Sequence, residues 1–293
     1  MCGQQADTAQ GEAVLNEALA AFRQALGSRL VAGYALGSLA HGGFSPLVSD
    51  VDLGLILADP PRLTDRLAIR RVAGGVRAGG SALHRRLSVF WGTPATLAGQ
   101  ARGGRFPPLD RLDLLEYGRL LTEQDARQET ARPDRTELLV AGAEFALSSL
   151  AGDPSVSGRL REWARLRVHP DSAEAEIRNP RLLVSRGPRR VTKVVLFPVR
   201  FLFTADTGRV GTNHLAAEHY LAGGHAPAAE LVTAALGWRR EPPADAEAAV
   251  ALVGRDLIPL YVQYIDDHVA RLRAAGQHRL AGKFVRWRGR LTA

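Results

Sequence analysis

The sequence feature that most restricts the fold is the stretch Gly33–Leu57, GYALGSLAHGGFSPLVSDVDLGLIL. It contains two apolar runs that predict strands. Gly37 and Ser38 follow the first run, and Asp50 and Asp52 open the second. Because side chains alternate between the two faces of a strand, the two acids point the same way. The sequence therefore predicts two neighbouring strands with two carboxylates directed at one spot.

Two carboxylates on one face are typical of a site for a hard cation. Mg2+ prefers oxygen ligands and commonly takes a few protein carboxylates together with substrate phosphates. The missing side chain of Gly37 lets a phosphate approach the backbone, and the hydroxyl of Ser38 can bond to it. We therefore expect Asp50 and Asp52 to hold Mg2+ beside a phosphate. Each half of the motif alone is also compatible with a purely structural turn or strand end.

This stretch resembles the nucleotidyltransferase superfamily of the DNA polymerase β type. The resemblance consists of Gly-Ser, a connection from Leu39 to Ser49, Asp-x-Asp and then an apolar strand. The connection is slightly longer than usual. The resemblance implies an α/β nucleotidyltransferase domain with a small mixed sheet. It also implies that Asp50 and Asp52 act with Mg2+ on a nucleoside triphosphate, and that Ser49 assists in binding it.

The next predicted strand, Arg85–Gly92, departs from that resemblance. The resembling family carries a third catalytic carboxylate on this strand, where Leu87 or Ser88 stands here. No acid occurs between Asp65 and Asp110. The pattern leaves open whether another residue replaces the acid or whether catalysis is weakened or absent.

The Pro133-Asp134 step predicts a domain boundary, with a nucleotidyltransferase domain at 1–132 and a helical domain at 133–293. In the first domain, helices are predicted at 10–28 and Leu63–Val76 and strands at Leu30–Leu36, Arg85–Gly92 and Arg119–Leu121. Long helices with short loops predict an all-α bundle in the second. Its helices are predicted at Glu137–Leu150, Ser157–Arg167, Thr192–Asp206, Asn213–Leu221, Pro227–Leu236 and Ala244–Arg273.

Part of the second domain, Lys193–Gly223, resembles the helical domain of the streptomycin/spectinomycin adenylyltransferases. In that family an Arg in an apolar helix, a Thr-Gly pair further along and a Lys in the following loop complete the nucleotide site. Arg200 and Thr207-Gly208 fit this pattern, whereas Asn213 stands in the place of the Lys. The resemblance implies that Arg200 contacts the triphosphate.

Glu144 is a candidate for the base that the third strand does not supply. Its sequence neighbours are apolar, and burial among them would make its carboxylate a better proton acceptor. The competing interpretation is that Glu144 is a structural ion-pair partner, for example of Arg200.

Two charged segments have plain structural interpretations. Asp110, Asp113 and Glu116 have the spacing of one helical face, which could lie near the cleft but which we interpret as solvated. The C-terminal tail carries Trp287 among basic residues and could stack on and neutralise RNA, or it could be a solvated helix end. The basic residues of the tail are Lys283, Arg286, Arg288 and Arg290.

Composition sets outer bounds on partners and compartment. The 38 Lys and Arg against 30 Asp and Glu give a net charge of +8, which suits polyanions such as nucleic acid or a triphosphate. The one cysteine, Cys2, excludes a disulfide framework. The N-terminus lacks a signal-peptide pattern, and we find no apolar run near the length of a membrane span. These features predict a cytoplasmic protein.

Together these patterns predict transfer of AMP from Mg-ATP to a hydroxyl of a small molecule, with release of pyrophosphate. An aminoglycoside is one acceptor that the resemblance suggests, which would make the protein an antibiotic-resistance enzyme. RNA or protein acceptors remain alternatives. A non-catalytic nucleotide-binding or regulatory protein is a further alternative, favoured by the missing third acid.

Overall fold

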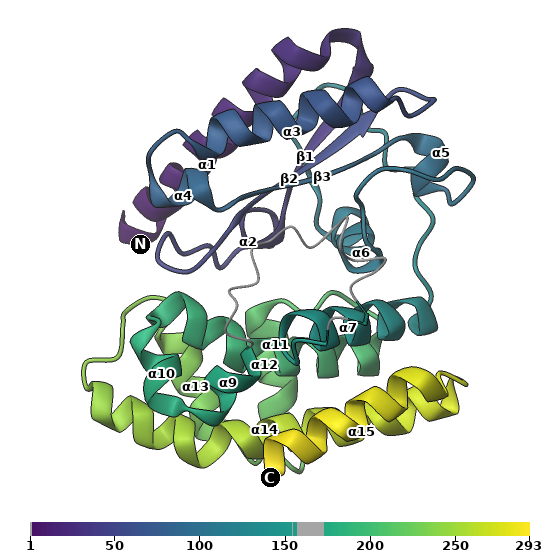
Figure 1. Cartoon of the computed structure of the whole chain (residues 1–293). Helices are drawn as coiled ribbons and strands as arrows, with labels where there is room; N and C mark the ends of the chain where they lie inside the picture. Colours follow the sequence, from purple (N-terminus) through teal and green to yellow (C-terminus); the bar gives the residue numbers. More distant parts are fainter. Residues whose placement is uncertain (1, 154, 157–172) are drawn as a thin grey trace. The chain divides into compact units, whose positions relative to one another are not determined.

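The computed structural model describes residues 2–153, 155–156 and 173–293 (Figure 1). The chain divides into two compact units, Met1–Pro133 and Asp134–Ala293, which we call the sheet unit and the helical unit. Each is described by itself. The helix expected at Ser157–Arg167 lies outside the described residues.

The sheet unit combines a four-stranded sheet with helices on both sides of it. Its elements in chain order are α1 (Cys2–Leu26), the 3-10 turn η1 (Gly27–Arg29), β1 (Leu30–Leu36), α2 (Gly37–His41), β2 (Val51–Leu57), α3 (Leu63–Arg77), α4 (Ala82–Arg85), β3 (Leu87–Gly92), α5 (Pro94–Leu97), α6 (Pro108–Glu116) and β4 (Arg119–Leu120).

The four strands form a mixed sheet in the order β3-β2-β1-β4. β2 pairs antiparallel with β1 and parallel with β3, and β4 pairs antiparallel with β1. In this register Asp52 lies opposite Leu36 on one neighbouring strand and opposite Ser88 on the other. The predicted small mixed sheet is confirmed, and the register fixes which residues surround the second acid of the motif.

Different segments of the chain pack on the two faces of the sheet. On the first, which we call the apolar face, Leu53, Leu55 and Leu57 pack against α1 and α3 (Figure 1). On the second, which we call the α6 face, Tyr34 and Ile56 pack with residues of the chain from α5 to α6. Asp52 alternates with the leucines of β2 and therefore belongs to the α6 face.

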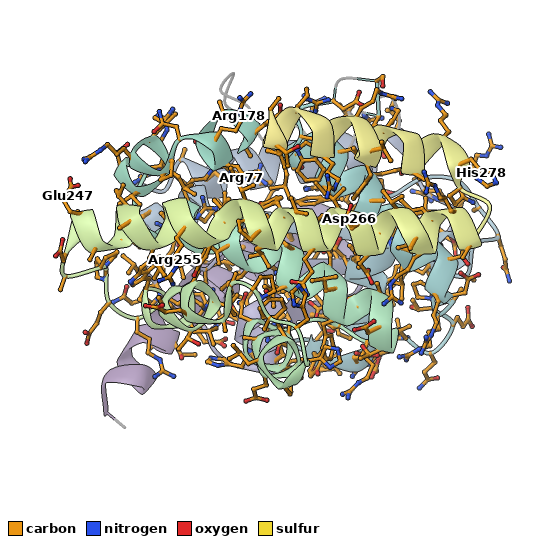
Figure 2. All side chains as sticks on the ribbon, turned by 90° about the horizontal axis from the view of Figure 1, so that it is seen from below. Arg77, Arg178, Glu247, Arg255, Asp266 and His278 are labelled. Carbon is orange, nitrogen blue, oxygen red and sulfur yellow. The ribbon has the colours of Figure 1, made fainter. Side chains whose placement is uncertain are left out.

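The helical unit is a bundle built around α14. Its described elements are α7 (Arg135–Ser149), α9 (Ala173–Arg178), α10 (Pro180–Ser185), α11 (Pro188–Thr207), α12 (Asn213–Ala222), α13 (Ala229–Gly237), α14 (Ala246–Ala274) and α15 (His278–Thr292). Figure 2 shows α14 and α15 side by side, with Glu247 near the start of α14 and His278 at the start of α15. The fold predicted from sequence, an α/β region followed by helices, is confirmed.

The helix α14 is, among the described residues, the one long and apolar enough to cross a membrane by length and composition. Within its most apolar 18-residue window, 44% of the residues are buried inside the protein. Tyr261, Tyr264 and Ile265 of this helix are fully buried against the rest of the bundle. In this structure α14 is therefore the core helix of the helical unit.

The interpretation of the C-terminal tail as an RNA-stacking segment or a solvated helix end is wrong for Trp287 and Lys283, whereas Arg286 and Arg290 are exposed on the same helix. Trp287 is fully buried between α14 and α15, where it packs edge-on against Tyr261 at a ring distance of 5.7 Å. Lys283 is also buried and donates to Ser155 at 2.6 Å. The tail folds as α15 because its apolar residues recur at helical spacing and complete the core.

Candidate active site

The predicted Gly-Ser turn is the start of a short helix. Gly37 is the first residue of α2 and has φ +59°, a conformation that costs little only for glycine. A Cβ added here would overlap with Oδ2 of Asp52. Gly37 is thus required twice, for its backbone conformation and for the space that the Asp52 carboxylate occupies.

The two acids of the motif lie at the entrance of β2. Asp50 directly precedes the strand, Asp52 is its second residue, and both are half-buried. Asp52 belongs to the α6 face, and Asp50 precedes it by two residues, the spacing that predicts a shared face on an extended chain. Among the described side chains, no group of three or more His, Cys, Asp or Glu is arranged to hold a metal ion. Any cation here would rest on the acid pair and on substrate oxygens.

The two serines near the acids differ in their surroundings. Ser38 is half-buried, and its hydroxyl makes no hydrogen bond to the described part of the protein. Ser49 is buried, and its Oγ accepts the backbone N–H of Ser45 at 3.0 Å. Ser49 thus holds the connection that leads to Asp50, whereas the hydroxyl of Ser38 can donate to a ligand.

The strand β3 brings no acid to the site. Ser88 stands directly opposite Asp52 and is half-buried, while Leu87 is buried on the apolar face. Ser88, and not Leu87, therefore stands at the position of the missing carboxylate. The departure from the resembling family lies beside Asp52 itself.

The interpretation of the acids of α6 as a solvated face is wrong for Asp113. Its side chain is only 9% exposed, and its Oδ2 accepts the N–H of Gly37 at 2.7 Å. The end of α6 also meets α2 through an edge-to-face contact of Tyr117 with His41, whose rings are 5.4 Å apart. An acid that sequence spacing places on a solvated face therefore contacts the first residue of α2.

A positive charge lies on the same face of the sheet. Arg105 pairs with Trp91 beside β3, donates to the carbonyl of Val89 at 3.0 Å and lies over the ring of Phe90. Burial lowers the pKa of Arg105, and the charges of Asp110 and Asp52 oppose that shift. Arg105 therefore partly balances the acids gathered on the α6 face.

In the helical unit, the charge of Arg200 influences a second, buried arginine, Arg239. Arg200 of α11 is half-buried, and its Nε donates to the carbonyl of Gly211 at 2.5 Å. Arg239, in the turn after α13, is only 8% exposed. Burial and the neighbouring charge of Arg200 lower the pKa of Arg239 to about 10. Sequence patterns did not indicate Arg239, because the charge of Arg200 that acts on it comes from a residue separated from it by two helices along the chain.

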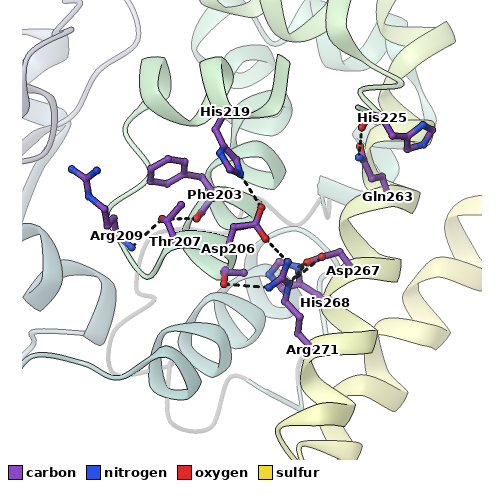
Figure 3. A network of polar contacts seen from close by, with 11 residues as sticks. Phe203, Asp206, Thr207, Arg209, His219, His225, Gln263, Asp267, His268 and Arg271 are labelled. Atoms are coloured by element: carbon purple, nitrogen blue, oxygen red, sulfur yellow. Dashed lines mark hydrogen bonds and ion pairs between the residues drawn. The ribbon is translucent and has the colours of Figure 1, made fainter. Parts of the chain in front are cut away.

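The Thr-Gly pair ends α11. Gly208 takes the left-handed conformation with φ +69°, and the hydroxyl of Thr207 donates to the carbonyl of Phe203 at 2.8 Å. Thr207 also accepts the N–H of Arg209, whose side chain is exposed (Figure 3). A cation thus follows the Thr-Gly pair directly, four residues before Asn213.

The end of α11 is tied to its neighbours by a network of charges (Figure 3). Asp206 pairs with Nε2 of His219 at 2.8 Å and also with Arg271. Arg271 in turn pairs with Asp267 at 2.8 Å. These contacts join α11, α12 and α14 and fix the position of the Thr207-Gly208 turn.

Glu144 lies on α7 of the helical unit and is half-buried. The residue after it, Phe145, packs against Phe197 and Phe201 of α11 at ring distances of 5.5 and 5.9 Å. These contacts pack α7 against α11 beside Glu144, and the role of Glu144 as a base stays a prediction.

No family model matches this chain, and no curated protein matches it. Among solved structures, it is similar to spectinomycin adenyltransferase AAD(9) from Enterococcus faecialis, which was solved with ATP and spectinomycin. The two chains superpose with a TM-score of 0.54 and share 12% sequence identity, over 84% of this chain and 98% of that chain. At this identity the likeness shows a shared fold, which agrees with the nucleotidyltransferase-like architecture described above.

Proposed function

We propose that the protein is a nucleotidyltransferase that moves AMP from Mg-ATP to a hydroxyl of a small molecule. The acceptor oxygen would form a bond to the α-phosphorus, the bond to pyrophosphate would break, and the acceptor would lose its proton. The shared fold with an adenyltransferase that was solved with ATP supports this class of reaction. Fold alone does not determine function, so the proposal depends on the site.

One observation carries the proposal. The carboxylate of Asp52 lies where a side chain of residue 37 would stand, directly beside the start of α2. The acid that would hold a cation is therefore adjacent to the turn that would bind phosphate. Ser38, next in the chain, has a hydroxyl that can donate to a phosphate oxygen.

The acid pair fits Mg2+, because carboxylate oxygens are its preferred ligands and two of them leave positions for phosphate oxygens. Asp50 and Asp52 would hold the ion. When bound, Mg2+ would supply positive charge against the triphosphate and the departing pyrophosphate. Ser38 would orient the triphosphate, and Ser49 would assist by fixing the connection that positions Asp50.

The helical unit would contribute to binding and proton transfer. We propose that Arg200 contacts the triphosphate, as the resemblance implies. Glu144 remains our candidate for the base that accepts the proton of the acceptor hydroxyl. The packing of α14 as a core helix supports the expectation that the enzyme works in the cytoplasm.

A second candidate function is a non-catalytic nucleotide-binding or regulatory role. The observation that favours it is Ser88, which stands opposite Asp52 where the resembling family carries an acid. A serine neither holds a metal ion as a carboxylate does nor acts as a general base at neutral pH. Nucleotide binding without transfer is the expected behaviour in that case.

The experiment that tests the proposal follows label from α-phosphate-labelled ATP, with Mg2+, to a panel of hydroxyl-bearing acceptors. The panel should include spectinomycin, streptomycin and total tRNA, which distinguishes small-molecule from RNA acceptors. Asp50→Asn and Asp52→Asn should each abolish labelling. Asp59→Asn is the matched control, because Asp59 is an exposed acid of the same unit.

Label on a small molecule that disappears in both site variants and persists in Asp59→Asn would support the transfer reaction. Mg2+-dependent binding of ATP without label on any acceptor would favour the non-catalytic candidate. Label that persists in Asp52→Asn would contradict the site.

A further inference from the structure

A buried carboxylate touches the phosphate-binding turn from outside the Asp-x-Asp motif. Asp113 is 9% exposed and comes from α6, 76 residues away from Gly37 along the chain. Burial of a carboxylate is costly unless hydrogen bonds or cations compensate for it. The backbone N–H of Gly37, at 2.7 Å from Oδ2, supplies one such bond.

Gly37 lies between two carboxylates. Oδ2 of Asp113 accepts its N–H, and Oδ2 of Asp52 fills the place of its missing side chain. From standard bond lengths, both oxygens lie within about 4 Å of the same Cα atom. Any rotation of the peptide before Gly37 would move the surface against which Asp52 rests.

Gly37 joins a strand of the sheet to a short helix that Leu39 anchors in the core of the apolar face. Leu36, before it, is paired with Asp52 in the sheet. After it comes α2, a helix of five residues that is followed by two more glycines with positive φ, Gly42 and Gly43. A helix of five residues depends on outside contacts, and for the first turn of α2 these include the packing of Leu39 and the hydrogen bond from Gly37 to Asp113.

We propose that Asp113 is a positioning residue of the proposed nucleotidyl transfer. By accepting the N–H of Gly37 it fixes the first turn of α2, and with it the carboxylate of Asp52 and the hydroxyl of Ser38. The inference rests on the proposed function. It assigns a part in the site to an acid that sequence spacing alone placed on a solvated face.

The test compares Asp113→Ala, which removes the acceptor of the Gly37 N–H, with Asp113→Asn, which keeps an acceptor oxygen and removes the charge. Glu116→Gln is the matched control, because it makes the same change of charge three residues along the same helix, where Glu116 pairs with Arg132. Each variant is assayed for kcat and nucleotide KM in the full chain. Hydrogen exchange of the Gly37 amide is measured in parallel.

We expect Asp113→Ala to lower kcat by about ten- to a hundredfold, the usual range for a lost hydrogen bond to a charged group, with nucleotide KM changed less than about threefold. The Gly37 amide should exchange faster in that variant. Asp113→Asn should recover most of kcat and the slow exchange, and Glu116→Gln should match the wild type.

Two results would overturn the inference. One is unchanged Gly37 exchange in Asp113→Ala. The other is an Asn variant that loses as much kcat as the Ala variant, since the charge and not the hydrogen bond would then matter. If the wild type transfers no label at all, the proposed function fails, and the exchange rates of the Ala and Asn variants still decide whether Asp113 anchors Gly37. The Asn variant also keeps the test valid if the Ala variant does not fold.

Discussion

The same strands form both faces of the sheet, but the two faces carry different kinds of side chain. On the apolar face, alternate residues of β2 and β3 are Leu, Val and Trp, and helices α1 and α3 exclude water from them. On the α6 face, the other alternate residues begin with Asp52 and Ser88 and become apolar only further along the strands. The polar end of the α6 face is where Gly37 and Asp113 meet.

The contrast shows how one strand can serve stability and chemistry together. A strand buried on both faces would have no place for Asp52, because an unpaired carboxylate inside a core is costly. β2 avoids this cost because Asp52 stands at the start of the strand. There its neighbours are the start of α2 and the half-buried Ser88, and not apolar side chains. Substitutions on the apolar face should therefore change stability, and substitutions on the α6 face should change activity.

The largest effect is expected for Leu55→Ala on the apolar face. Leu55 is fully buried in the central strand β2, and truncation of such a residue typically lowers the free energy of unfolding by about 3–4 kcal/mol. Urea denaturation measures this loss. The molecules that remain folded should keep the kcat of the wild type. A large fall in kcat at full folding would show that the two faces are not separable.

The next effect is expected for Gly37→Ala on the α6 face. The new Cβ would overlap with Oδ2 of Asp52, so we expect activity to fall about a hundredfold, equivalent to about 2.7 kcal/mol. Gly27→Ala is the control, since Gly27 also has a positive φ, +52°, but nothing lies within 4 Å of an added Cβ. Backbone strain should cost both variants about 1–2 kcal/mol of stability.

Only the difference in activity between these two glycine variants reports the displacement of Asp52. Equal activity of Gly37→Ala and Gly27→Ala would contradict the role that we assign to the space beside Gly37. Steady-state kinetics on samples whose folded fraction has been checked by circular dichroism would settle the matter.

Much of this fold follows from local sequence patterns. The strands at Leu30–Leu36 and Val51–Leu57 and the helices at Leu63–Arg77 and Asn213–Ala222 were predictable, because apolar spacing and glycine or proline breaks are local signals. The predicted Gly-Ser turn was harder to interpret, because a tight turn and the first turn of a helix begin with the same residue types.

The side chains that sequence patterns misplaced depend on contacts far along the chain. Asp113 has the spacing of a helical face with two other acids, and its burial and its contact with Gly37 distinguish it from a solvated residue. Trp287 lies among basic residues in sequence, but Tyr261 and Phe284 enclose it in the fold. Arg239 gives no local signal at all. Spacing predicts which residues share a face, whereas burial of that face is decided by its partner.

The smallest effect is expected for an acid that supports the apolar face from α3. Burial alone would raise the pKa of Asp65, but hydrogen bonds from Arg29 and from the N–H of Arg62 bring it below its ordinary value. A carboxyl whose pKa is lowered by folding stabilises the protein above its unfolded pKa of about 3.9, and this contribution is lost as the pH falls through the folded value. Asp65→Asn should therefore lower the free energy of unfolding by about 1–2 kcal/mol at pH 7, and the deficit should shrink below about pH 4.

Asp125→Asn is the comparison on the α6 face, where the acid accepts the hydroxyl of Tyr34 and is one-third exposed. Because exposed pairs contribute less, its deficit at pH 7 should be smaller than that of Asp65→Asn. Urea denaturation of both variants between pH 3 and 7 measures the difference. Equal deficits, or a deficit of Asp65→Asn that grows on acidification, would show that the apolar face does not depend on this ion pair.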